Sequence, residues 1–367
     1  MAYTTIDDPS EYFTTLLYTG NATDNRNLTN NANAGDFKPD WLWLKERGAT
    51  SSHQLHDSTR GSSFAVMSDS TAVEDEDANR VQAFQTNGFQ VGTASTVNQN
   101  NIAMVAWQWK ANGGTTTTND ASSTGVGSID SVIQANTTAG FSIVTYTGNG
   151  TEGASFAHGL GVAPDLVIIK GRSHADNWPV FNGTSNTTSR SLHLEGNDAE
   201  IPVSSYNFWN LYWDETRPSS TVVTLGVDAK LNGDGRTFVA YCFVGIPGYS
   251  KLGTYVGNGS GANSSTNGTF VYTGFKPAWV MVKATTVAQG WNIFDNKRAP
   301  TNEMGAFLFA DTADAETTGY DSMDFLSNGF KLRRNLNGTN DSDQSYVYLA
   351  FAEHPFVSST GTPTTAG

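Results

Sequence analysis

Three stretches of the chain share one pattern of polar and apolar positions. In each, a proline precedes four large or β-branched apolar residues and a lysine closes the run; the stretches are Phe37–Lys45, Val162–Lys170 and Phe275–Lys283. Runs without polar interruption are typical of strands that are covered on both faces. Their spacing is that of a small domain rather than of a solenoid turn. The pattern therefore predicts three buried strands, one in each of three related units.

Further elements recur around each Pro-strand-Lys stretch. An aromatic turn precedes it, at Tyr18–Asn21, Tyr146–Asn149 and Tyr255–Asn258. A closing apolar run follows it, at residues 102–109, 237–243 and 346–351. In two units Asn-Gly lies between alternating apolar positions, at Asn87-Gly88 and Asn328-Gly329. That pattern predicts a hairpin with a type I′ turn, whose two central residues need positive φ.

The composition favours an all-β fold. Thr, Ser and Asn abound, 37 glycines and 11 prolines supply turns, and no stretch keeps a helical apolar period over three turns. We expect three tandem β-sandwich repeats, jelly-roll or lectin-like, of about 110 residues each, a size that buries its own core. The expected boundaries are 1–112, 136–248 and 249–357 for the repeats, 113–135 for a flexible Gly/Ser/Thr connector, and 358–367 for a disordered tail.

The charge balance excludes two classes of partner. Thirty-five acidic residues against 21 basic ones give a net charge of −14. A chain with this balance is not expected to bind nucleic acid by phosphate neutralisation, or an anionic membrane surface. No apolar run reaches transmembrane length, and Met1–Asp8 has neither a basic nor an apolar signal region. We therefore expect synthesis in the cytoplasm without a signal peptide.

Two segments of the second unit, Tyr146–Thr151 and His158–Lys170, resemble the repeat of virion structural proteins from tailed, mainly marine, bacteriophages. The opening Met1–Phe13 and the ending Tyr346–Phe356 are similar to the start and finish of such proteins. The resemblance implies a non-enzymatic tail or fibre protein, located in the virion, with other virion proteins as partners. It also implies a homo-oligomer, trimeric if the protein is a fibre, and it supplies no catalytic residues.

An unusual concentration of aromatic residues marks the second unit at residues 207–213. Trp209, Asn210, Tyr212, Trp213 and Asp214 are the candidate ligand-binding residues. Aromatic faces beside amide and carboxylate groups suit a sugar ligand such as a host-surface glycan. The alternative is that these rings fill the core of the unit or pack against a neighbouring subunit.

Candidate catalytic groups are weak by comparison. Glycoside hydrolysis needs two carboxyl groups roughly 5–10 Å apart, and the candidates are Glu74–Asp77, Glu195 with Asp198, and Asp214-Glu215. No nucleophile elbow of the Gly-x-Ser-x-Gly type is found. We expect no enzymatic activity, with polysaccharide depolymerisation as an alternative.

Metal and cofactor sites have little support in the sequence. His53 and His56 lie three apart beside Asp57, but no further Cys or His cluster completes a set. His158 precedes a Gly-Leu-Gly turn, which we expect it to cap. The Asp-rich loops at Asp311–Asp314 and Asn340–Asp343 place oxygen ligands at alternate positions, so calcium is kept as an alternative to an expectation of no cofactor.

Two classes of function follow. In the first, the units present loops for recognition of the host surface, and repetition multiplies weak contacts. In the second, the protein is an architectural subunit, such as a head decoration, whose surfaces contact other subunits and no host ligand.

Overall fold

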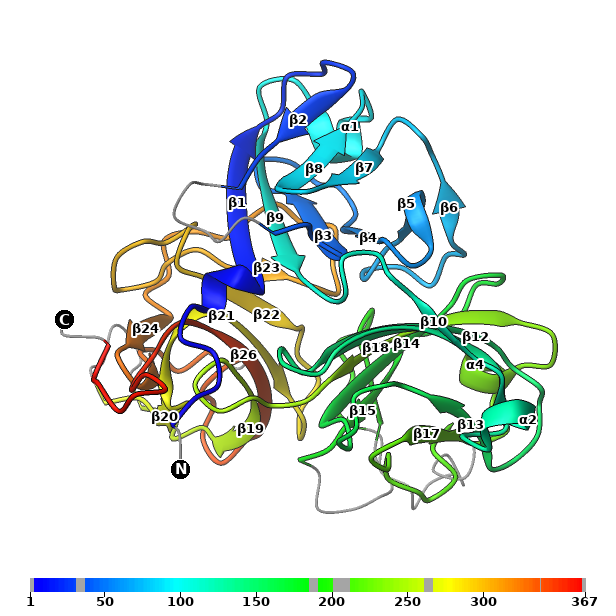
Figure 1. The fold of residues 1–367 in the computed structure, drawn as a ribbon. Helices are drawn as coiled ribbons and strands as arrows, with labels where there is room; N and C mark the ends of the chain where they lie inside the picture. The colour runs from blue at the N-terminus through cyan, green and yellow to red at the C-terminus, as the bar shows by residue number, and fades with distance from the viewer. Residues whose placement is uncertain are drawn as a thin grey trace.

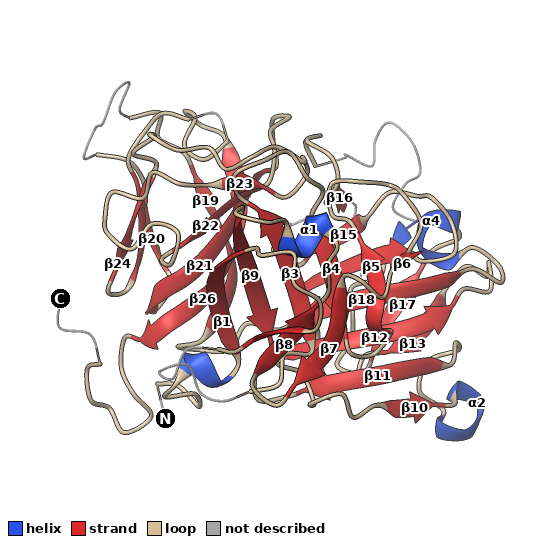
Figure 2. Cartoon of the chain, turned by 90° about the horizontal axis from the view of Figure 1, so that it is seen from above, coloured by secondary structure: helices blue, strands red, loops and turns tan. Residues whose placement is uncertain are grey.

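The computed structural model describes residues 3–30, 37–184, 191–200, 212–260, 267–336 and 338–364. Strands make up nearly all the regular structure, and the helices within these ranges are single turns (Figure 2). They are η1 (Pro9–Glu11), α1 (Ser95–Asn98), α2 (Ala121–Thr124) and α4 (Ala229–Asn232). The expected all-β class is confirmed.

Most strands belong to three large antiparallel sheets, which form three lobes around a common centre (Figure 1). In spatial order the first contains β1 (Phe13–Thr19), β9 (Ala103–Trp109), β3 (Trp41–Glu46), β4 (Gln54–Asp57), β5 (Gly61–Val66) and β6 (Asp75–Glu76). The second contains β10 (Thr117–Asn119), β11 (Ser131–Asn136), β12 (Phe141–Thr147), β18 (Thr237–Phe243), β14 (Leu166–Gly171), β15 (Pro179–Asn182) and β16 (Ser191–His193). The third contains β19 (Ser250–Val256), β26 (Ser345–Pro355), β21 (Phe275–Ala284), β22 (Asn292–Asp295) and β23 (Leu308–Phe309).

A small sheet packs on each large one. The small sheets are β2 (Arg26–Leu28), β8 (Gly88–Val91) and β7 (Val81–Gln85); β13 (Ala154–Ala157) and β17 (Val222–Leu225); and β20 (Phe270–Tyr272), β25 (Gly329–Leu332) and β24 (Met323–Leu326). The space between each small sheet and its large sheet holds a separate hydrophobic cluster.

The three Pro-strand-Lys stretches form β3, β14 and β21, at equivalent places in the three large sheets. Each pairs with the long closing strand of its sheet, and the pairs Trp41↔Trp109, Leu166↔Phe243 and Trp279↔Phe351 share one register. All residues of β3 and β14 are buried, as the uninterrupted apolar runs predict.

The reason for this double burial is that each of these strands faces two cores. Successive side chains of a strand point to opposite faces. In β3, Trp41 and Trp43 enter a central cluster, whereas Leu42 and Leu44 enter the cluster beneath the first small sheet. β14 and β21 divide their side chains in the same way. The central cluster takes side chains from all three large sheets, so the three sheets share one core.

Polar contacts between the large sheets repeat the same geometry. Each lysine that closes a Pro-strand-Lys stretch is buried and donates hydrogen bonds to a backbone carbonyl of a neighbouring sheet's loop. The contacts are Lys45 Nζ to Ala313 O at 3.3 Å, Lys170 Nζ to Thr71 O at 2.8 Å and Lys283 Nζ to Asp198 O at 2.7 Å. Lys45 of the first sheet thus contacts the third sheet, Lys170 of the second contacts the first, and Lys283 of the third contacts the second. The three contacts therefore close into a ring.

Two of the three boundaries also hold an ion-pair cluster, in which one Asp–Arg pair is fully buried and the other members are half-buried. At the boundary of the first and second sheets it consists of Asp57, Arg60, Glu74 and Arg172. At the boundary of the third and first sheets it consists of Asp295, Arg298, Glu316 and Arg47. At the remaining boundary Asn182 takes the position of Asp57 and Asp295, and Thr285 takes that of Arg172 and Arg47. The backbone N–H of Glu200 donates to Thr285 O at 2.9 Å, as the N–H groups of Glu74 and Glu316 donate to Arg172 O and Arg47 O.

Both predicted hairpins are present, but the turn lies one residue earlier than expected. Gln85 pairs with Gly88 and Leu326 with Gly329, so Thr86-Asn87 and Ser327-Asn328 form the loops. Gly88 follows the loop instead of forming its second central residue, and two features favour glycine there: a φ of 97° and a close neighbouring strand. A Cβ on Gly88 would lie 2.1 Å from the carbonyl oxygen of Leu28, on the neighbouring strand β2.

Two segments that we expected to lack structure are folded in their described parts, 113–135 and 358–364. The segment 113–135 contains β10, α2 and most of β11, and Ile129 and Ile133 are buried in the second cluster. These isoleucines, together with the side chain of Asp120 capping α2, order a segment whose Ser, Thr and Gly content suggested a flexible connector. In the tail, Ser359 donates its backbone N–H to Asp7 at 2.7 Å, and Val357 pairs with Pro363.

Candidate functional site

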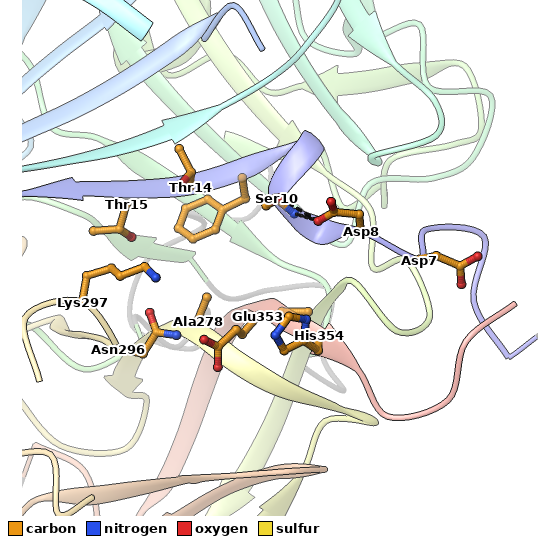
Figure 3. Close-up of a pocket in the computed structure, with 12 residues that line it drawn as sticks. Asp7, Asp8, Ser10, Thr14, Thr15, Ala278, Asn296, Lys297, Glu353 and His354 are labelled. Atoms are coloured by element: carbon orange, nitrogen blue, oxygen red, sulfur yellow. Dashed lines mark hydrogen bonds between the residues drawn. The ribbon is translucent and has the colours of Figure 1, made fainter. Parts of the chain in front are cut away.

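A cavity of about 650 Å³ lies between β1 of the first large sheet and the third large sheet. We call it the β1 groove; it is lined by Asp7, Asp8, Ser10, Phe13, Thr14, Thr15, Ala278, Asn296, Lys297, Ala352, Glu353 and His354. Thr14 and Thr15 form one wall, and Asn296, Lys297 and Glu353 lie across from them (Figure 3). A second cavity of about 250 Å³ continues past Asn296, Lys297 and Glu353 towards Asn302.

Local structure fixes each wall. Asp8 caps η1 by accepting from the backbone N–H of Ser10 at 2.9 Å, which sets the entry into β1. On the other side the loop after β22 is held by the carboxylate of Asp295, which accepts from the backbone N–H of Lys297 at 3.0 Å. Lys297 and Asn296 are therefore carried on a rigid turn rather than on a long loop.

The groove contains polar atoms that are buried and lack a partner. Thr15 is 6 % exposed, and its Oγ1 has no hydrogen-bond partner among the described residues. The same holds for Asn296 Oδ1 across the cavity. Burying such groups without a hydrogen bond costs free energy. A ligand that supplies the missing partners would recover that cost.

The acidic groups of the groove are already engaged. Glu353 pairs with Lys276 at 3.0 Å. The hydroxyl and backbone N–H of Ser359 donate to Asp7, and these hydrogen bonds lower the pKa of its carboxyl group. Because these carboxylates are engaged, the groups left for a ligand include the uncharged Thr15 Oγ1 and Asn296 Oδ1, which suit a polar ligand bound by hydrogen bonds.

The aromatic stretch predicted as a ligand site is mostly packed inward. Tyr212 and Trp213 are 1 % and 0 % exposed and belong to the cluster beneath the second small sheet, where Trp213 packs edge-on against Phe181. The core-packing alternative therefore holds for these two rings, because neither presents a face on which a sugar could stack. Asp214 is half-buried, and Trp209 and Asn210 lie outside the described residues.

The histidines that were weighed as metal ligands or as a turn cap are part of the fold's internal contacts. His53 accepts from Trp43 Nε1 at 2.7 Å through Nδ1, so its Nε2 carries the proton and donates to Phe309 O at 2.9 Å. Burial lowers the pKa of His53 to about 3. His53 immediately precedes β4 and His56 lies within it. Because they are three residues apart, they face opposite sides of the sheet, which prevents a shared metal. His158 caps its turn as expected, accepting from the backbone N–H of Leu160 at 3.2 Å.

The candidate catalytic carboxylates take part in internal contacts. Glu74 bonds Arg60 at 2.7 Å and Arg172 at 2.8 Å. Burial raises its pKa, but the hydrogen bonds and charges of the two arginines outweigh burial, and the net pKa is lowered. Glu195 accepts from the backbone N–H of Trp178 at 2.8 Å. Glu74 and Glu195 thus stabilise a sheet boundary and a loop, whereas Asp198 and Glu215 are exposed and Asp214 is half-buried.

The loops suggested for calcium are also internally bonded. Asp311 accepts from the backbone N–H of Trp291 at 2.7 Å, and Asn340 Oδ1 accepts from that of Asn258 at 3.2 Å. Within the described ranges no group of three or more His, Cys, Asp or Glu side chains could hold a metal ion.

Sequence reasoning missed the β1 groove, which combines residues from both ends of the chain. The sequence of β1 itself does not mark it as the uncovered edge of a sheet. A signal comes from comparing the units: the second has strand-forming residues before its aromatic strand, at Val132-Ile133, whereas the first has only Asp7–Tyr12 in that place.

The comparisons with known proteins place the chain in a family. Residues 8–355 match the family described as a domain of unknown function (DUF7483), and the chain belongs to that family. The match runs from η1 to the end of β26, so one family unit spans all three large sheets. No curated protein and no solved structure matches the chain. Among the described helices, none has the length and apolar character needed to span a membrane.

Proposed function

We propose that this protein is a non-enzymatic structural component of a bacteriophage virion, built from three copies of one β-sandwich repeat around a shared core. The observation that carries the proposal is the ring of equivalent contacts between the three large sheets. The buried lysines, the indoles of Trp178 and Trp291, and His53 all bond backbone carbonyls of a neighbouring sheet. Side chains that often serve catalysis are here used to hold one sheet against the next.

The resemblance of Tyr146–Thr151 and His158–Lys170 to virion repeats supports the class of particle. Of the two roles that this class allows, we favour the architectural one, with other virion proteins as partners. The buried positions of Tyr212 and Trp213 remove two of the rings that a glycan site would use. Host-surface glycan recognition by a tail fibre is the second candidate; its support is the resemblance and the acidic surface, which keeps a particle soluble.

The test is to locate the protein in purified particles of the virus whose genome encodes it. An antibody raised against the recombinant chain is used for immunogold labelling, and an antibody against the major capsid protein serves as the control. We expect regular labelling at one place on the particle. Infectious particles that carry the capsid label but none of this protein would refute the proposal.

Two solution assays separate the roles. The soluble protein is applied to a glycan array and to host cells; the architectural role predicts no binding, and saturable binding would favour recognition. Release of reducing ends from host polysaccharide would instead favour a depolymerase. The mass of the protein in solution, measured by light scattering, tests the proposed homo-oligomer, trimeric if it is a fibre.

A further inference from the structure

β1 is the last strand of the first large sheet, and no described strand pairs with its outer edge. Its counterpart in the second sheet is β12, which pairs with β18 on one side and with β11 on the other. The two strands correspond residue by residue. Phe13 pairs with Trp109 as Phe141 does with Phe243. The first sheet therefore lacks a strand that the second sheet possesses.

β11 shows what a strand does in that place. Gln134 lies opposite Ile143, and its side chain reaches the boundary with the first sheet. Its Nε2 donates to Ser58 Oγ at 3.0 Å and to Thr59 Oγ1 at 2.8 Å, and its Oε1 accepts from the backbone N–H of Gly114 at 2.7 Å. One amide side chain thus satisfies donors and acceptors from a neighbouring sheet.

At the boundary of the first and third sheets, the β1 groove lies where β11 lies at the boundary of the first and second sheets. Asn296 and Lys297 follow Asp295 as Ser58 and Thr59 follow Asp57, and both aspartates hold their turns with the same backbone hydrogen bonds. Thr15 corresponds to Ile143, the residue opposite Gln134. A cavity takes the place of the strand here, and the unpartnered atoms Thr15 Oγ1 and Asn296 Oδ1 face it.

The chain's own strand of this kind, β11, is held between β10 and β12 in the second sheet. We therefore propose that the β1 groove receives an extended segment of a different polypeptide, which adds to the first large sheet as a strand antiparallel to β1. Strand addition to an open edge gains affinity from main-chain hydrogen bonds and specificity from alternate side chains. The segment carries an amide side chain opposite Thr15, because an amide donates to Asn296 Oδ1 and accepts from Lys297 Nζ at once. Its neighbours on the other face are apolar, as Ile133 and Ala135 are in β11.

The probe is a fluorescein-labelled peptide with the sequence of residues 129–137, titrated onto the full-length protein and followed by fluorescence anisotropy. We expect saturable binding, weakened at least fivefold when the glutamine of the peptide is replaced by leucine. Hydrogen exchange should slow at β1 when the peptide is added and stay unchanged at β12, whose edge β11 already covers. Binding without protection of β1, or no saturable binding at millimolar peptide, would overturn the proposal.

Variants of the groove make the test specific. Thr15→Arg fills the cavity and should abolish peptide binding, while Thr254→Arg, on the exposed side of β19, should leave it unchanged. Should Thr15→Arg fail to fold, Asn296→Ala removes the amide partner without adding bulk to the groove and should weaken binding at least threefold. Protection of β1 that rises with protein concentration alone would identify a second copy of the chain as the occupant, and would refute a different polypeptide. None of these outcomes depends on where the protein sits in a particle.

Discussion

Replacing Trp41 by alanine tests whether the three large sheets form one cooperative unit. Trp41 is 1 % exposed and lies on β3 of the first sheet, yet it stacks on Tyr241 of the second sheet at a centroid distance of 4.5 Å. It also packs against Trp109 at 4.5 Å and Phe141 at 5.7 Å. The side chain thus joins two sheets within the central cluster.

The expected loss is about 4 kcal/mol in the free energy of unfolding, within the range for a fully buried tryptophan truncated to alanine. The shift in melting temperature depends on how much of the chain unfolds together. Over all 367 residues the entropy of unfolding is ~0.8 kcal/mol/K, so the midpoint should fall by ~5 °C. A separate unit of about 110 residues would instead shift by ~17 °C, while the rest of the chain melted at its original temperature.

Differential scanning calorimetry distinguishes these outcomes. We expect one transition in the wild type and one in Trp41→Ala, displaced by the smaller amount. Val162→Ala, at a position that is 55 % exposed, is the control and should leave the midpoint nearly unchanged. Two or more transitions, of which only one moves in Trp41→Ala, would refute the shared core as the main source of cooperativity.

Three further predictions concern the sheet boundaries and the turns. Glu74→Gln leaves two arginines facing a neutral amide at a half-buried position and should cost about 1.5–3 kcal/mol in urea unfolding, whereas Glu76→Gln, at an exposed position, should cost under about 0.5 kcal/mol; equal effects would contradict the assignment. Gly20→Ala would place a Cβ 2.0 Å from the carbonyl oxygen of Gln99 and should lower the melting midpoint by several degrees, while Gly48→Ala, whose Cβ meets nothing closer than 3.8 Å, should not. Burial lowers the pKa of each lysine that closes a Pro-strand-Lys stretch to about 8. Because the unfolded chain then holds more protons between pH 8 and about 10, stability should rise with pH in that window, by up to about 1.4 kcal/mol per pH unit for each lysine; a flat or falling unfolding free energy there would refute the shift.

The sequence predicted local structure well because local structure depends on local pattern. The alternation and the β-branched runs fixed the all-β class, and the Pro-strand-Lys stretches indicated strands buried on both faces. The two Asn-Gly hairpins were also found. The predicted turn was wrong, because each glycine follows the two-residue loop instead of lying within it. The close approach of Leu28 O to Gly88, a tertiary contact on a neighbouring strand, could not be predicted from the local pattern.

Segments judged by composition alone were predicted less well. The Ser- and Thr-rich stretch 113–135 was expected to be flexible, but Ile129 and Ile133 find a place in the second cluster. Tyr212 and Trp213 could serve either a ligand or a core, and only their burial decides for the core. A local sequence pattern shows that a side chain is apolar, but it does not show which residues from elsewhere in the chain cover that side chain.

By itself, then, the sequence determined the class of fold, the buried strands and the recurrence of one motif at Pro39, Pro164 and Pro277. The tertiary structure alone decided that the second faces of those strands meet in one core, and that the closing lysines reach across to the next sheet. It also left β1 without the strand that covers β12. Such features depend on residues far apart in the chain coming together, and the packing free energy that joins them is a property of the assembled sheets rather than of any single segment.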